Sequence, residues 1–293
     1  MYNPNRHLIL SSFWIRIIGL VTMTFDHIGV FLASNADRNI AQAGDIFRII
    51  GRIAFPLFIF LLAEGMRYSH NKEKYLLRMG GIYVLLTVAQ VIGIYGMGIY
   101  QLNQAPNPFA DLILVALVLY FLSGKQWWKK LIALMPAGVL ITSFFLRVLE
   151  LNGEITITWW PFPFRPAYSL LGLGAGVLFY YSSSIVTFFS HKTNQYLGIS
   201  DDLYRESPSG IAAANIVRVL FLASIVLGLW GLSYINERSI DPMNMSFQAW
   251  CLLACIPLLL YNGQKGYSSL WFRIFSYAYF PVHLIIIFLI FGL

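Results

Sequence analysis

Apolar stretches close to the length that crosses a lipid bilayer recur along the chain, separated by short polar connections. A transmembrane helix needs about 20 predominantly apolar residues, because the hydrocarbon core is about 30 Å thick. The pattern predicts an all-α fold, a polytopic membrane helical bundle of about nine (eight to ten) transmembrane helices. The predicted spans are Phe13 to Ser34, Phe47 to Ser69, Tyr75 to Ile94, Phe109 to Ser123, Leu131 to Leu149, Pro166 to Phe188, Ala213 to Ile235, Phe247 to Tyr261 and Phe272 to Phe291.

Two segments leave this count open by about one span. The Gly-rich segment Ile92 to Tyr100 and the aromatic segment Ile155 to Phe164 each have the composition of a re-entrant turn or a further crossing. No internal repeat is visible in the sequence. We therefore expect residues 1–293 to form a single transmembrane domain.

Composition agrees with a membrane protein. The chain is 58% hydrophobic and 11% charged, against about a quarter charged in an ordinary soluble domain. Its net charge of +7 does not indicate a nucleic-acid partner, because membrane proteins gather Lys and Arg in cytoplasmic loops and no basic stripe lies elsewhere. Cys251 and Cys255 lie one helical turn apart within an apolar stretch, where small packing residues are expected. The first span is too long for a signal-peptide core, so we expect it to remain in the mature protein.

The distribution of basic residues predicts the topology. Cytoplasmic loops carry an excess of Lys and Arg. With nine spans, the side of the N-terminus carries Arg6, Arg67, Lys72, Lys74, Arg78, Lys125, Lys129, Lys130, Lys192, Arg205, Lys265 and Arg273, and the other side mainly Arg38, Arg48, Arg147, Arg165 and Arg238. The N-terminus and the connection Ser190 to Gly210 should therefore be cytoplasmic, and that connection has the mixed composition of a solvated loop.

Three ionisable residues, Arg16, Asp26 and His27, lie in or at the first span. Each costs roughly 2.5 to 3.5 kcal/mol to insert into hydrocarbon, which favours a functional use. Arg16 and His27 are eleven residues apart, so they share one helix face and lie about 16 Å apart along the axis. A base inside the bilayer with a cation nearer the surface suits a group-transfer reaction. The donor molecule would place its phosphates at the membrane surface and its reactive carbon inside the bilayer.

The first two spans place two pairs of opposite charge at matching depths of an antiparallel hairpin. Arg16 is expected at the same depth as Glu64, and Asp26 at the same depth as Arg52. Charges inside membranes usually survive by pairing, so both pairs have a structural interpretation as clamps and a functional one near the donor. His27 has no partner by this register, and Asp26 points about 100° away from it. It is either a catalytic base or a histidine hydrogen-bonded to a neighbouring helix.

The last span contains His283 two residues after Pro281. A proline inside a helix cannot donate its backbone hydrogen bond, so the carbonyl of Tyr277 is freed and the helix is expected to kink. His283 lies near the same depth as His27. It is either part of a cavity at the kink or a packed histidine beside it.

Further candidates lie in the connections. Tyr75 and Arg78, with Lys72 and Lys74, have the composition of a phosphate-binding funnel, although the positive-inside bias alone also explains the basic residues. The outer aromatic residues have the composition of an interfacial belt or an acceptor-binding surface. They are Trp159, Trp160, Phe162 and Phe164. The chain has no zinc-type ligand spacing, so no metal is expected.

Four motifs occur together in the order that characterises one family. They are Thr22-Met-Thr-Phe-Asp26-His27-Ile-Gly29, the run from Gly51-Arg52 through Phe55-Pro56-Leu-Phe58 to Glu64-Gly65, Lys74-Tyr75-Leu-Leu-Arg78, and Tyr279-Phe-Pro281-Val-His283-Leu284. The chain resembles the TraX family of integral-membrane acetyltransferases, whose namesake acetylates the N-terminus of conjugative pilin. The resemblance covers most of the chain and is weaker in Asn103 to Asp111 and in the outer loop Ile155 to Arg165.

A more distant similarity points to the same chemistry. Arg16, ten intervening residues and His27 are similar to the first-helix signature of the acyltransferase type 3 family, and Phe55-Pro56-Leu-Phe58 is similar to another of its motifs. The resemblance assigns the base role to His27, a donor-side role to Arg16 and a supporting role to His283.

The resemblances imply a single acetyl-CoA-dependent acetyltransferase domain in the bacterial cytoplasmic (inner) membrane, with a protein, peptide or glycan as acceptor. The candidate catalytic residues are His27, Asp26 and His283, and the candidate acetyl-CoA-binding residues are Arg16, Arg52, Glu64, Tyr75 and Arg78. Direct transfer and an acetyl-histidine intermediate both fit the residues. A proton-coupled transporter or permease would also keep intramembrane charges, and a non-enzymatic membrane assembly partner would need them only for packing.

Overall fold

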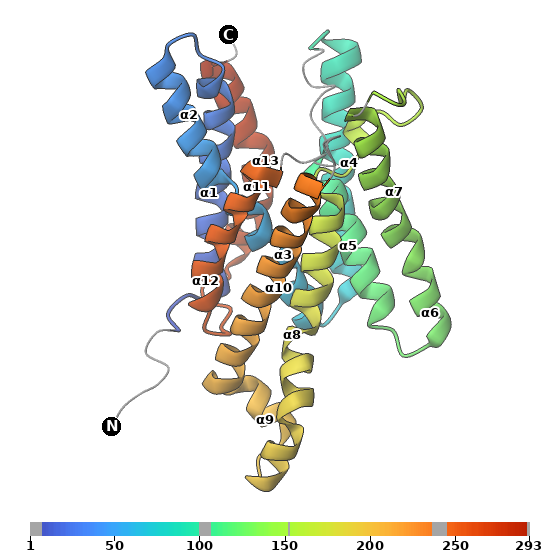
Figure 1. Ribbon diagram of the computed structural model, residues 1–293, viewed down its shortest axis with the longest axis vertical. Helices are drawn as coiled ribbons and strands as arrows, with labels where there is room; N and C mark the ends of the chain where they lie inside the picture. Colours follow the sequence, from blue (N-terminus) through green and yellow to red (C-terminus); the bar gives the residue numbers. More distant parts are fainter. Residues whose placement is uncertain (1–7, 100–106, 152, 236–244, 292–293) are drawn as a thin grey trace. The chain divides into compact units, whose positions relative to one another are not determined.

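The computed structural model describes residues 8–99, 107–151, 153–235 and 245–291, and every regular element in these ranges is a helix (Figure 1). The chain forms two compact units. The first unit comprises residues 1–61, 181–224 and 246–293, and the second comprises residues 62–180 and 225–245. Arg6 and Arg238, which entered the topology count, lie outside the described residues.

The prediction of an all-α, multi-pass membrane protein is confirmed. Within the described residues, seven helical stretches are long and apolar enough to cross a membrane. They are Ser12–Ala33, Arg38–Tyr68, Lys72–Gly96, Trp127–Leu151, Ser169–Tyr196, Pro208–Leu232 and Leu270–Phe291. The other two predicted spans coincide with shorter apolar helices, Pro108–Leu122 and Ala249–Leu259.

The first unit contains the two ends of the chain and part of its middle. Its helices are α1 (Ser12–Ala33), α2 (Arg38–Gly51), α3 (Ala54–Tyr68) as far as Leu61, the end of α8 (Ser169–Tyr196), α9 (Asp201–Glu206), most of α10 (Pro208–Ile235), α11 (Met245–Gln248), the 3-10 helix η4 (Ala249–Ala254), α12 (Cys255–Leu259) and α13 (Leu270–Phe291).

The second unit contains the central helices. They are the end of α3, α4 (Lys72–Val91) with the π-helical turn η1 (Ile92–Gly96), α5 (Pro108–Leu122), α6 (Trp127–Ile132), α7 (Leu134–Leu151), the 3-10 turn η3 (Phe162–Phe164), the first part of α8 and the end of α10. Asp111 on α5 holds the start of α8, because its carboxylate accepts the backbone N–H groups of Ala167, Tyr168 and Ser169. The segment Ile155 to Phe164 contains no long helix, so a tenth crossing there is wrong.

Glycines let α1 and α2 pack closely in an antiparallel hairpin. A side chain on Gly51 would collide with Asp26, and one on Gly44 would collide with the backbone of Ala33. A Cβ on Gly29 would lie 2.7 Å from the carbonyl oxygen of Gly44. Small residues allow this kind of backbone approach between membrane helices. The contacts follow the register that was predicted for this hairpin.

Helix α1 runs parallel to α13, and the two lie side by side (Figure 1). The ring of Phe13 contacts that of Phe272 near the start of both helices, at 4.7 Å, and Phe31 stacks on Phe291 near their ends, at 6.0 Å. The segment before α1 pairs with the connection before α13, where the Ser12 N–H donates to Gln264 O at 2.8 Å. Parallel first and last spans require an odd number of crossings, which allows seven or nine and excludes eight or ten.

The predicted solvated loop from Ser190 to Gly210 is helical over most of its length. Helix α8 continues to Tyr196, and Ser200 caps α9 by accepting the N–H of Leu203 at 3.2 Å. Pro208 then begins α10. At 28 residues α8 is about 42 Å long, which exceeds the hydrocarbon thickness of about 30 Å. Its final turns are exposed and extend the helix beyond an apolar core of that thickness.

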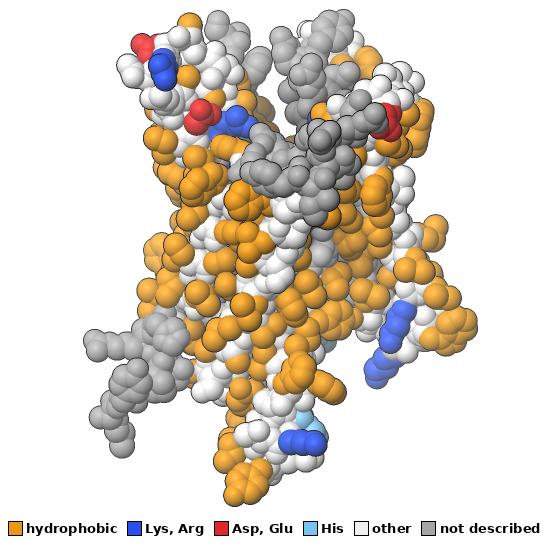
Figure 2. Space-filling model, in the orientation of Figure 1, with side chains coloured by type: hydrophobic (Ala, Val, Ile, Leu, Met, Phe, Trp, Pro, Cys, Tyr) orange, Lys and Arg blue, Asp and Glu red, His pale blue; other side chains and the backbone are white. Residues whose placement is uncertain are grey.

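Hydrophobic side chains cover the helices on the face drawn in Figure 2, and the charged ones seen there lie near helix ends. Large apolar side chains such as Leu85, Phe145 and Phe188 are exposed. A soluble protein rarely exposes so much contiguous apolar surface, whereas a membrane protein presents it to lipid. The lipid bilayer is the partner that this surface fits.

Candidate functional site

Two histidines from opposite ends of the chain contact each other in the first unit. His27 Nδ1 on α1 lies 2.7 Å from His283 Nε2 on α13, and the rings are 4.9 Å apart. His27 is partly exposed, whereas His283 is buried. The sequence left His27 either as a base or as a histidine bonded to a neighbouring helix, and the hydrogen bond of the second alternative is present. This hydrogen bond uses one ring nitrogen of His27, Nδ1, and does not involve the other, Nε2.

The hydrogen bonds fix which nitrogen is left. His283 Nδ1 lies 2.8 Å from the carbonyl oxygen of Tyr279, which can only accept, so Nδ1 carries the proton. In the neutral ring His283 Nε2 then has the lone pair, and His27 Nδ1 must donate to it. The neutral His27 ring therefore presents an unprotonated Nε2. This is the arrangement in which a partner orients a histidine that acts as a base.

Aromatic packing holds this pair in place. The Tyr279 ring stacks on His283 at 5.0 Å, and its hydroxyl lies 2.6 Å from Thr24 Oγ1. Thr24 already donates to the carbonyl of Leu20, so the Tyr279 hydroxyl is the donor between the two. Phe280 presents its edge to His27. Tyr279 and Phe280 also pack on the buried core formed by Leu20, Met23 and Ala54.

Arg16 shares the His27 face of α1, as predicted. Its guanidinium lies 5.8 Å from the ring of Phe272 on α13. Arg16 and His27 are eleven residues apart on α1, and their partners Phe272 and His283 are eleven residues apart on α13. The two contacts therefore lie at corresponding levels of two parallel helices. Arg16 is partly exposed, and no ion pair with it is found within the described part of its own unit.

The predicted pair of Asp26 and Arg52 is confirmed as an ion pair. The side chains are 16% and 14% exposed, respectively. Arg52 also donates to Gln248 Oε1 at 3.1 Å and to the carbonyl of Arg48 at 3.3 Å. No hydrogen bond joins Asp26 to His27 among the described residues. Asp26 thus faces α2 as a structural clamp, and its candidate role in catalysis has no support from a contact with the imidazole.

The remaining candidates for the donor site belong to the second unit. Glu64 is buried, and a side chain on the adjacent Gly65 would lie 2.9 Å from the hydroxyl of Tyr75. Arg78 is exposed on α4. Because Glu64 and Arg16 belong to different units, their predicted pairing stays a prediction. The roles of Tyr75 and Arg78 also stay predictions.

The outer aromatic segment is anchored from within the second unit. Arg165 donates to Glu150 Oε2 at 2.7 Å and to the carbonyl of Ile157 at 2.8 Å, and it also bonds the carbonyl of Trp160. The Trp159 ring stacks on that of Trp160 at 6.0 Å and is exposed. An exposed tryptophan stacked on a partly exposed one fits both alternatives that the sequence left open, a membrane-interface belt and an acceptor surface.

Sequence reasoning missed two buried polar residues. Gln248, at the end of α11, contacts Arg52. Arg218 on α10 is 2% exposed and donates to Ser182 Oγ at 3.0 Å and to Asn215 Oδ1 at 2.7 Å, while its guanidinium lies 5.0 Å from the Phe60 ring. A signal for Arg218 was present, because an arginine inside an apolar span is costly unless it is bonded.

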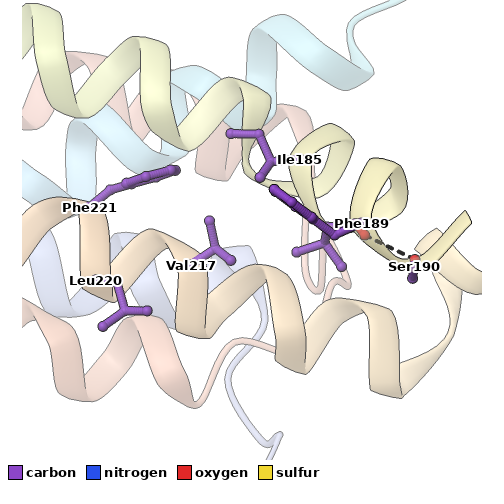
Figure 3. A pocket seen from close by; sticks show the side chains of 7 residues that line it. Ile185, Phe189, Ser190, Val217, Leu220 and Phe221 are labelled. Atoms are coloured by element: carbon purple, nitrogen blue, oxygen red, sulfur yellow. Dashed lines mark hydrogen bonds between the residues drawn. The ribbon is translucent and has the colours of Figure 1, made fainter.

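An apolar groove between α8 and α10 is separate from these polar residues (Figure 3). It holds about 410 Å³ and is lined mainly by aliphatic and aromatic side chains, among them Ile185, Val217 and Phe221. Ser190, its polar residue, donates its hydroxyl to the carbonyl of Val186 at 2.9 Å. The groove therefore lacks a base or a cation with which to carry out group transfer.

Comparison with known proteins identifies the family. The TraX protein family matches residues 11–156, about half of the chain, which include Asp26, His27 and Arg52. The chain is also similar to the probable fimbrial assembly protein FimC, serogroup H1, of Dichelobacter nodosus, with 31% identity over 75 residues. That match covers 26% of this chain and 29% of the relative, so the chain spans less than a third of the relative's length. No solved structure matches the chain. With its motifs and this match, the chain belongs to the TraX family.

Proposed function

We propose that this chain is a membrane-embedded acetyltransferase that moves acetyl from acetyl-CoA to an amine or hydroxyl acceptor. The observation that carries the proposal is the His27–His283 pair, which leaves His27 Nε2 unprotonated inside a helical membrane protein. The four family motifs support the same chemistry, because they place Asp26-His27 on α1 and His283 on α13.

In the proposed reaction His27 Nε2 accepts the proton of the acceptor N–H or O–H as the acceptor attacks the thioester carbon. A bond forms from the acceptor atom to the acetyl carbon, the carbon–sulfur bond breaks, and the His27 imidazolium returns the proton to the leaving thiolate. His283 holds the imidazole through Nδ1 throughout. General-base help of this kind contributes roughly 10² to 10⁴ in rate.

Arg16 has the position for a donor-side role. It lies about 16 Å from His27 along α1, on the same face and nearer the helix start. A guanidinium binds phosphate oxygens in a bidentate manner and stays charged when partly buried. We infer that Arg16 binds phosphates of acetyl-CoA, and that the thioester extends along the α1–α13 face toward His27.

The acceptor class is inferred from the relatives. A TraX-type activity would acetylate a pilin N-terminus, and the similar Dichelobacter nodosus protein is described as a probable fimbrial assembly protein. We therefore propose a pilin-type protein as the acceptor and the bacterial inner membrane as the location. An uncharged α-amine is a suitable nucleophile for a neutral histidine base.

The orientation is part of the proposal, with the N-terminus and α9 on the cytoplasmic side where acetyl-CoA is found. A cysteine introduced at Ser200, next to α9, should resist an impermeant thiol reagent in intact cells and react after permeabilisation. Labelling in intact cells would show that the orientation is the reverse of the proposed one. Arg16 would then lie on the side of the membrane that has no acetyl-CoA.

The test of the function is acetyl transfer by purified protein in lipid nanodiscs, with labelled acetyl-CoA and a peptide that carries a pilin-type N-terminus. His27→Ala should bind acetyl-CoA and lose about two to four orders of magnitude in turnover. The matched control is His191→Ala, since His191 is an exposed histidine bonded to Asp201. Wild-type protein that neither binds acetyl-CoA nor transfers acetyl would overturn the proposal. A proton-coupled transporter would instead show His27-dependent uptake without transfer.

A further inference from the structure

Two basic side chains of the second unit lie against one aromatic ring. The Arg67 guanidinium, in the last turn of α3, lies 5.6 Å from the centre of the Tyr180 ring on α8. Lys72 Nζ, at the start of α4, lies 5.9 Å from the same centre. An aromatic ring attracts a cation, so this ring holds two positive charges close together. All three side chains are partly exposed, so a ligand can reach the two charges.

The turn after α5 brings a third cation to the same place. Lys72 Nζ donates to Ser123 Oγ at 2.9 Å. The next residue, Gly124, makes room for the stem of Lys129, because a Cβ on Gly124 would lie 2.9 Å from Lys129 Cδ. Lys72 and Lys129 therefore both lie at the turn that follows α5. We call Arg67, Lys72 and Lys129 the basic corner.

Nearby carboxylates do not neutralise the two lysines of the basic corner. Glu73, in the first turn of α4, accepts the hydroxyl of Tyr120 at 2.9 Å, and Glu64 is buried in α3. Within the described part of the chain, neither Lys72 nor Lys129 forms an ion pair. An ammonium group has three N–H donors, and Lys72 uses one of them for Ser123. An anion with several oxygens, such as a phosphate, would accept the remaining donors and offset the repulsion between the cations.

The surface beside the basic corner has the composition of a membrane interface. Trp127 and Trp128 begin α6 and are exposed, and Lys129 Nζ lies 5.5 Å from the centre of the Trp128 ring. Leu131 and Leu134, which follow on α6 and α7, are exposed as well. Basic side chains lie beside hydrophobic ones at the α6 end of the second unit (Figure 2). Tryptophan is enriched at the level of lipid head groups, so the cations lie at the depth where lipid phosphates are found.

We propose that the basic corner binds the phosphate group of an anionic phospholipid, whose acyl chains lie along the exposed apolar side chains of α6 and α7. The phosphate oxygens accept from Lys72 Nζ, Lys129 Nζ and the Arg67 guanidinium. A soluble phosphate would satisfy the same donors, but it would leave the apolar surface beside them unused. The inference goes beyond the proposed acetyltransferase function and does not depend on it.

A diffuse attraction between basic loops and the membrane makes a different prediction. Lys and Arg gather on the cytoplasmic side of membrane proteins for reasons of topology, and each of them attracts anionic lipid to a similar extent. Lys192 is an exposed lysine that the topology count places on the same side. If the attraction is diffuse, Lys192→Gln and Lys72→Gln should have equal effects. If the basic corner is a site, only Lys72→Gln should weaken the binding of the first lipid.

The experiment titrates the purified full chain, in a neutral detergent, with phosphatidylglycerol or with phosphatidylcholine of the same acyl chains. Native mass spectrometry counts the bound lipids. The first phosphatidylglycerol should bind at least about 10-fold more tightly than phosphatidylcholine, and Lys72→Gln and Lys129→Gln should each weaken it about 5-fold. Lys192→Gln should have no effect, and Lys72→Arg, which keeps the charge, should retain most of the affinity. If Lys72→Gln fails to fold, Lys129→Gln decides the question.

Competition identifies the source of the phosphate. Inorganic phosphate and CoA, added separately to the phosphatidylglycerol complex, should not displace the lipid, because neither carries acyl chains for the apolar surface. Displacement by either one that requires Lys72 would overturn the assignment to a lipid. Equal affinities for the two lipids, or equal losses in Lys192→Gln and Lys72→Gln, would overturn the site itself.

Discussion

Asp26 and His27 are neighbours in sequence, yet they face different helices and are bonded in different ways. Asp26 faces α2, where glycines bring the backbones together and the carboxylate pairs with Arg52. His27 faces α13, where aromatic rings pack around a pair of histidines. On the first face the Asp26 carboxylate has a charged partner. On the second face His27 Nε2 has no hydrogen-bond partner among the described residues.

The difference shows how a single residue step along a helix separates a contact that stabilises the fold from one that serves chemistry. Successive side chains diverge by about 100°, so an ion pair can fix the helix without neutralising the base beside it. A rigid α1–α2 contact then positions the α1–α13 face. Changes on the Asp26 face should lower stability before turnover, and changes on the His27 face should do the reverse.

Asp26→Asn should have the largest effect on folding. It leaves Arg52 as a largely buried charge without its carboxylate, which costs about 3 to 5 kcal/mol for buried pairs. The melting temperature or yield should fall, while turnover per folded molecule changes little. Asp201→Asn, which alters a partly exposed carboxylate bonded to His191, is the control. A stable but inactive Asp26→Asn protein would assign Asp26 to the chemistry.

His283→Ala should lower turnover by up to about 10²-fold, less than loss of His27 itself. The variant keeps the base and loses the acceptor that orients it. His283→Asn, which retains an acceptor oxygen, should recover part of the rate. Equal rates for His283→Ala and His283→Asn in folded protein would mean that the His27 contact carries no orienting role.

Arg16→Ala should weaken acetyl-CoA binding by about 10- to 100-fold, as expected for a charge-assisted hydrogen bond worth about 1.5 to 3 kcal/mol. The rate at saturating donor should be nearly unchanged. Arg38→Ala, which removes an exposed arginine at the start of α2, should leave both values intact. Calorimetry with CoA measures the affinity, and turnover assays measure the rate at saturating acetyl-CoA. A lower rate with unchanged affinity for acetyl-CoA would mean that Arg16 acts in the chemical step and not in donor binding.

Gly51→Ala should destabilise the α1–α2 face by about 1 to 3 kcal/mol, because the new methyl group collides with Asp26. Gly228→Ala on α10 meets nothing within 4 Å and provides the matched control. Thermal unfolding in the same detergent compares the two. A neutral Gly51→Ala change would mean that the close approach is not required.

The smallest effect concerns pH. Hydrogen bonds from Asn194 and His191 lower the pKa of the Asp201 carboxyl below its usual range. A carboxyl with a lowered folded pKa stabilises the protein above its unfolded pKa, about 3.9, and loses that contribution as the pH falls through the folded value. Asp201→Asn should therefore slightly flatten the acid limb of the melting temperature below about pH 4, without the loss at neutral pH expected of Asp26→Asn. An unchanged acid limb would contradict this.

The sequence predicted contacts that depend on local periodicity. The shared face of Arg16 and His27 follows from the helical repeat, and the Asp26–Arg52 pair follows from the register of a hairpin. The contact of His27 with His283 could not be predicted, because nothing in a periodic pattern states that the first and last spans pack together. That contact joins positions 256 residues apart.

Other differences have local physical causes. The Ser190 to Gly210 segment had the composition of a loop, yet Ser200 and Pro208 are recognised helix-start residues and do begin α9 and α10. The break at Gln248 has no such signal, because an apolar run does not distinguish α-helix from 3-10 helix. The contact of Gln248 with Arg52 is visible only in the structure.

The most direct test of the central claim is the protonation of the His27 ring. Nuclear magnetic resonance of protein with ¹⁵N-labelled histidine, assigned with His27→Ala and His283→Ala variants, reports each ring nitrogen separately. At pH 8 we expect His27 Nδ1 to be protonated and coupled to His283 Nε2, and His27 Nε2 to be unprotonated. A protonated His27 Nε2, in either the opposite tautomer or the imidazolium, would contradict the account, because no base would then face the acceptor.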